Sequence, residues 1–114
     1  MAGLRTTACD QWRAAIALQD EWDLARVEEL RAELSGHLDA GRRVIHVDLG
    51  EVTFLDSTML GELATVSQRC REGHGLLILT KVPPRVRRVI EVAGMDAVLL
   101  TDGSRPPDGD APSI

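Results

Sequence analysis

Aromatic side chains and positive charge are scarce in this sequence of 114 residues. The aromatic residues are Trp12, Trp22 and Phe54, with no tyrosine, and they are too few to form a stacking surface for single-stranded nucleic acid. The formal net charge of -5 at pH 7 also argues against a protein that binds a phosphate backbone. We therefore expect no nucleic-acid partner.

Long hydrophobic runs are missing as well. No run of about 18 apolar residues occurs, which argues against a membrane span, and the N-terminus does not resemble a signal peptide. The two cysteines, Cys9 and Cys70, lack the spacing of a metal site. Cys70 falls on the apolar face of a predicted helix, so we expect a buried free thiol. These features predict a reduced cytoplasmic protein with no membrane partner.

The composition that is present suits one small globular domain, with 44% hydrophobic and 27% charged residues. We divide the chain into a loose N-terminal segment at residues 1–10, a folded domain at 11–101 and a disordered polar tail at 102–114.

Strand patterns alternate with helix patterns along the domain. Strands are expected at residues 11–18, 44–47, 76–79 and 98–100, with 44–47 in the centre and buried on both faces. Helices are expected from Leu24 after a loop at 20–23, from Ser57 to about Gly73, and from Pro83–Pro84 to Gly94. The alternation predicts an α/β domain with a mixed sheet of about four to five strands and helices packed on it.

The most informative stretch is Asp48–Gly61, in which a buried strand gives way to a helix that begins with Asp56-Ser57-Thr58. Asp56 is suited to cap this helix. The N-terminus of a helix has unpaired N–H groups and a favourable field for an anion. Ser57 is therefore a candidate phosphorylation site, with Thr58 as the second choice, although the local sequence alone favours a simple helix cap.

One face of this predicted helix is small and polar. Ser57, Gly61 and Thr65 recur at helical spacing, and Gly61 costs up to about 1 kcal/mol relative to alanine in a helix interior. The face is either an ordinary solvated surface or a flat docking surface. The docking surface that we predict consists of Asp20, Asp23, Asp56, Ser57, Thr58, Gly61, Glu62 and Thr65.

The run from Val44 to Gly61 resembles the signature of the STAS domains of bacterial anti-sigma factor antagonists, in which an apolar strand and an Asp precede Asp-Ser-Ser/Thr-Gly-Leu. The turn at residues 20–23 is similar to the Gly-Glu-Leu/Ile-Asp turn of that family. The strand at 76–79 and the helix at 86–94 also fall where the family has them, so the resemblance covers about residues 11–101.

The resemblance implies a regulatory binding protein rather than an enzyme, with no catalytic residue, cofactor or metal. The expected partner is an anti-sigma factor that is also a serine kinase with a histidine-kinase-type ATP fold. Binding would release a sigma factor, phosphorylation of Ser57 would end the binding, and a PP2C-type phosphatase would reset the cycle.

Three residues depart from the family pattern. Met59 replaces a common glycine, and it either faces the core or alters the docking surface. His46 replaces an apolar strand residue, and we expect a core histidine that is hydrogen-bonded to a backbone group. Asp20 replaces the glycine of the turn, which would reshape the loop beside Ser57.

Three other functions are compatible with parts of the sequence to different degrees. A STAS scaffold that is not phosphorylated, for example in a lipid-transport complex, would share the fold. A receiver domain would use Asp20 and Glu21 as an acidic pair, Asp48 as phospho-acceptor and Lys81 as the strand-end lysine around Mg²⁺. A serine hydrolase is disfavoured because Ser57 lacks the G-x-S-x-G elbow. The cluster Arg85, Arg87 and Arg88 is interpreted as a solvated helix face.

Overall fold

A computed structural model describes residues 3–100 of the chain. Its sheet has four strands in the order β1-β2-β3-β4. They are β1 Leu4–Cys9, β2 Arg13–Trp22, β3 Val44–Leu55 and β4 Leu76–Thr80. β1 runs antiparallel to β2, whereas β2, β3 and β4 are parallel. The predicted mixed sheet is thus confirmed, with four strands.

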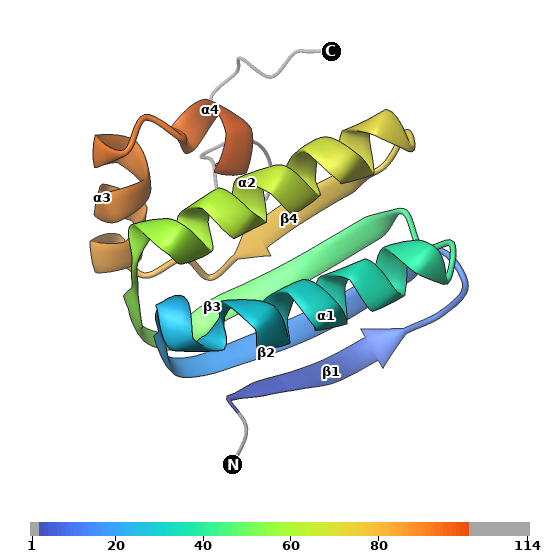
Figure 1. Ribbon diagram of the computed structural model, residues 1–114, viewed down its shortest axis with the longest axis horizontal. Helices are drawn as coiled ribbons and strands as arrows, with labels where there is room; N and C mark the ends of the chain where they lie inside the picture. The colour runs from blue at the N-terminus through green and yellow to red at the C-terminus, as the bar shows by residue number, and fades with distance from the viewer. Residues whose placement is uncertain (1–2, 101–114) are drawn as a thin grey trace.

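The helices follow the strands in sequence (Figure 1). A short 3-10 helix, η1 Leu24–Arg26, leads into α1 Val27–Asp39. The helix α2 Ser57–Glu72 connects β3 to β4, and α3 Pro84–Val92 and α4 Asp96–Leu99 come last. Figure 1 shows α1 and α2 lying side by side on one face of the sheet, with α3 beside the first turns of α2.

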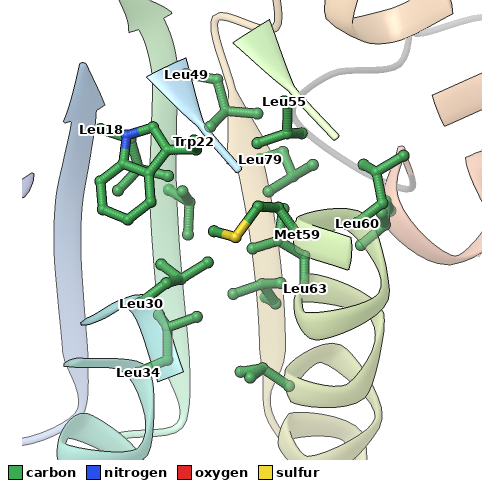
Figure 2. Packing of buried hydrophobic residues seen from close by; sticks show 14 of the residues in the cluster. Leu18, Trp22, Leu30, Leu34, Leu49, Leu55, Met59, Leu60, Leu63 and Leu79 are labelled. Atoms are coloured by element: carbon green, nitrogen blue, oxygen red, sulfur yellow. The ribbon is translucent and has the colours of Figure 1, made fainter. Parts of the chain in front are cut away.

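The core lies between the sheet and these two helices. Alternate residues of β3, namely Ile45, Val47 and Leu49, are completely buried under the helices. Figure 2 shows Met59 of α2 directed into the centre of this cluster, among leucines of α1, α2 and the sheet. A single contiguous core of this kind accounts for the stability of a domain of this size.

The central position of β3 is confirmed, but its predicted burial on both faces is wrong. Val44, His46 and Asp48 point to the other face of the sheet and are only half-buried, because α1 and α2 cover one face alone. His46 also differs from expectation. It lies half-buried in a hollow beside Cys9, and its ring makes no hydrogen bond within residues 3–100.

Several other local predictions are corrected. Residues 4–9 are not loose, because their backbone pairs with β2 even though most of their side chains are exposed. The expected loop at 20–22 is the end of β2. Leu24 belongs to the 3-10 helix and is 65% exposed, so it does not join the apolar stripe of α1. Residues 96–99 form a helix rather than a strand. The predicted tail at 102–114 lies outside the described residues.

Candidate functional site

The candidate site is built on the turn from β3 into α2. Asp56 has extended backbone dihedral angles and caps the helix, because its Oδ1 accepts a hydrogen bond from the backbone N–H of Met59 at 3.0 Å. Its Oδ2 accepts a second hydrogen bond from the N–H of Leu24, also at 3.0 Å. The predicted cap is confirmed, and the same carboxylate ties the start of η1 to the start of α2.

The first turn of α2 divides into an exposed half and a buried half. Ser57 and Thr58 are exposed, whereas Met59 and Leu60 are fully buried. Of the two alternatives for Met59, the structure has the core-facing one (Figure 2). Replacement of the family's glycine therefore changes internal packing and leaves the outer surface of this turn unaltered.

The polar face of α2 continues from Ser57 through Gly61 and Thr65. A Cβ atom at Gly61 would meet nothing within 4 Å, so the protein itself does not require glycine there. The hydroxyl of Thr65 donates to the carbonyl oxygen of Gly61 at 3.0 Å. The carboxylate of Glu62 forms an ion pair with Arg31 of α1 at 3.1 Å, and its side chain is only 10% exposed. Glu62 is therefore bound within the protein and little exposed on the polar face.

Of the two aspartates predicted for the site at the end of β2, Asp23 lies beside the capped turn and Asp20 lies further away. Asp23 caps η1 by accepting from the N–H of Ala25 at 3.0 Å, and it lies next to the Leu24 that Asp56 binds. Asp20 lies further back along β2, paired with Val52 of β3. Its φ of 68° is in the left-handed region, which favours glycine and tolerates aspartate. This backbone conformation explains why the Gly-Glu-Leu/Ile-Asp turn, to which residues 20–23 are similar, has glycine at this position.

A hollow of about 490 Å³ lies beside Ser57. Leu60 of α2 and Val89, Val92 and Ala93 from α3 and its end give it apolar walls, and Arg85 and Arg88 also line it. Val92 is 81% exposed and Val89 38%. In the sequence, Val89 falls on an apolar stripe with Val86, Ile90 and Ala93, which predicts that it faces the core, and Val92 lies off that stripe. The apolar neighbourhood of Ser57 was therefore missed. The signal that could have found it is the spacing of Val89 and Val92, which puts two valines on one face of α3 beside Arg85 and Arg88.

The receiver interpretation is not supported by the geometry. Asp48 pairs with Lys81 at 3.5 Å, but within residues 3–100 no three His, Cys, Asp or Glu side chains are grouped as a metal site requires.

Cys70 is buried as predicted, and burial raises the pKa of its thiol, which makes it a poor nucleophile. Every helix in this range is too short or too polar to cross a membrane.

The fold and the capped Asp-Ser-Thr turn define a class of regulatory domain. The chain belongs to the STAS domain family, since the family model described as "Mlab, STAS domain" matches residues 7–101.

Relatives and solved structures agree with this assignment. A Bordetella bronchiseptica protein described as a candidate anti-sigma factor antagonist, BtrV, is 33% identical over 77% of this chain and 76% of its own length. The anti-sigma-B factor antagonist of Staphylococcus aureus is 28% identical over 89% and 94%, respectively. The unphosphorylated anti-sigma factor antagonist SpoIIAA has the same fold, with a TM-score of 0.75, 23% identity and 84% of each chain covered.

Proposed function

We propose that this chain is an anti-sigma factor antagonist that binds an anti-sigma factor and thereby releases a sigma factor. The proposed partner is a serine kinase with a histidine-kinase-type ATP fold, which phosphorylates Ser57 and so ends the interaction. A PP2C-type phosphatase resets the protein, and all of this takes place in the cytoplasm. The observation that carries the proposal is the exposure of Ser57 beside an apolar hollow, on a helix turn whose neighbouring residues are fixed in the core.

A phosphate at this position can supply the energy that the proposed switch needs. It adds about -1.5 to -2 charges at pH 7, directly next to the carboxylate of Asp56. A hundredfold loss of affinity corresponds to about 2.7 kcal/mol. Like-charge repulsion together with desolvation of the phosphate in an interface can supply that amount.

The fold does not have to change for this switch to work. Asp56 holds the first turn of α2 through two backbone hydrogen bonds, and Met59 and Leu60 are buried beneath it. A phosphate on the exposed Ser57 would therefore sit on a rigid turn, in the favourable field of the helix N-terminus. Binding is lost through the altered surface alone.

The first test uses three variants and the kinase partner encoded by the same organism. Ser57→Ala should bind this partner with or without ATP, whereas Ser57→Asp should bind more weakly, by less than the full phosphate effect because it carries fewer charges. Thr58→Ala is the matched control, because Thr58 is the adjacent exposed hydroxyl, and it should still lose affinity when ATP is added. Binding is measured by isothermal titration calorimetry.

The second test is site-resolved mass spectrometry on protein purified from its native cells, before and after phosphatase treatment. A reversible phosphate on Ser57 is the expected result. An unmodified chain under several growth conditions would contradict the switch. That outcome would favour the alternative of a STAS scaffold that binds its partner constitutively, with Asp56 and Ser57 acting only in the helix cap.

A further inference from the structure

We propose that a phosphate on Ser57 is held within the same chain by Arg85 and Arg88 of α3, and that this intramolecular clamp covers the apolar hollow between α2 and α3. The inference rests on the proposed phosphorylation of Ser57 and specifies how that modification acts. Its starting observation is that Ser57, Arg85 and Arg88 line one hollow, in which they are the only polar residues among residues 3–100.

The two arginines are available for such a contact. Arg85 donates to the backbone carbonyl of Thr53 at 3.4 Å, and neither Arg85 nor Arg88 forms an ion pair with a carboxylate in residues 3–100. By contrast, Arg26, Arg31 and Arg69 each have an acidic partner. The two charges that line the hollow together with Ser57 are thus not neutralised by carboxylates of residues 3–100.

The spacing of the arginines suits a single anion. Residues three apart on a helix lie on the same face, so Arg85 and Arg88 both reach the hollow, whereas Arg87 between them does not line it. A guanidinium group binds phosphate oxygens in a planar, two-pronged geometry, and such charge-assisted bonds are stronger than neutral ones. Side chains of the apolar walls would screen a phosphate held against them less than water does, which strengthens the attraction further.

The clamp would change more than the charge of the site. In the unmodified chain, Val89 and Val92 present exposed apolar surface next to Ser57. Arginine side chains drawn over a phosphate at Ser57 would lie across this surface and remove it from contact with a partner. Phosphorylation would then withdraw a docking surface as well as add repulsion.

The clamp is tested on full-length protein with phosphoserine incorporated at position 57 during synthesis, which makes the measurement independent of any kinase. The pH titration of the phosphate is followed by ³¹P NMR. Two cationic groups favour the dianionic form, so the titration midpoint should be about half a pH unit or more lower in the wild type than in the double variant Arg85→Gln/Arg88→Gln. Arg87→Gln, the matched control, removes charge from the same helix and should leave most of this difference in place.

A second readout guards against misinterpretation of the titration. Phosphoserine should raise the thermal midpoint of the wild type relative to the unmodified chain, and this gain should disappear in the double variant. Equal ³¹P midpoints in the wild type and the double variant would refute the clamp while leaving phosphorylation of Ser57 intact. An unmodified Ser57 in native cells, with the ³¹P shift present, would instead contradict the proposed function alone.

Discussion

The two ends of α2 are constructed in opposite ways, although they belong to one helix of 16 residues. At the first turn, Asp56 holds the backbone and Ser57 faces outward beside an apolar hollow. Just after its last turn, the N–H of Gly75 donates to the carbonyl of Cys70 at 2.7 Å, and the N–H of Leu76, the first residue of β4, donates to the carbonyl of Arg43 at 2.9 Å. The C-terminal end of α2 is therefore held by the short connection to β4, which is itself bonded to the residue before β3.

The N-terminal end of α2 thus carries the proposed partner-binding surface, whereas the C-terminal end is a structural anchor. The C-terminal end is fixed by backbone contacts that leave no room for a side chain at Gly75. At the N-terminal end, a side chain at Gly61 would meet nothing, and exposed apolar residues of α3 lie next to Ser57. Under the proposed function, this arrangement would allow Ser57 to be modified or covered without disturbing the core.

The largest effect is expected from breaking the anchored end with Gly75→Ala. The new Cβ would overlap the backbone carbonyl of Arg43, and since backbone cannot easily move aside, we expect a loss of about 3 kcal/mol in the free energy of unfolding. Urea denaturation measures the loss. Gly73→Ala is the matched control, because its Cβ would have only ordinary contacts, 3.7 Å or more from Cys70. Equal stability of the two variants would contradict the anchor.

A smaller effect is expected from Asp56→Ala, which removes the cap at the N-terminal end of α2. Two backbone N–H groups, those of Met59 and Leu24, lose their acceptor, and the unfolding free energy should fall by about 1–2 kcal/mol. Asp56→Asn retains one acceptor oxygen in place of two, so its stability should lie between that of the wild type and Asp56→Ala. A denaturation series that ranks the asparagine variant with the alanine variant would argue against the two-sided cap.

The smallest effect on stability comes from Gly61→Ala, and it has the opposite sign. The helix gains about 0.5–1 kcal/mol because alanine loses less backbone entropy on folding and meets no atom within the protein. The added methyl group should nevertheless weaken binding of the proposed kinase partner, since it projects into the predicted docking surface. Thermal unfolding and calorimetric binding measure the two effects on one sample. A gain in stability with unchanged affinity would remove Gly61 from the docking surface.

Local sequence patterns correctly predicted those features that depend on residue type and spacing within one turn or helix. The cap at Asp56, the start of α2 at Ser57 and the burial of Cys70 are confirmed, because each depends on residue type and spacing within one turn or helix. The edge strand β1 was missed. Its side chains are mostly exposed, so the strand is held by backbone pairing with β2, which leaves no periodic apolar signal.

Local sequence patterns also could not predict the structure at the end of the domain or the residues that surround Ser57. Val98–Leu100 has strand-like composition, yet 96–99 form a helix, because Leu99 and Leu100 reach the core from that conformation. The proximity of Arg85 and Arg88 to Ser57 depends on how α3 packs after β4. About thirty residues separate the two arginines from Ser57 in the sequence.

The sequence by itself determined most of the strands and helices and the capped Asp-Ser-Thr turn, because short-range propensities and spacing carry that information. Its resemblance to the STAS signature indicated the family. Only the tertiary structure decided that Met59 fills the core, that Glu62 is engaged by Arg31 and that an apolar hollow with two arginines lies beside Ser57. These features depend on which surfaces of distant segments meet, and packing is a property of the whole fold.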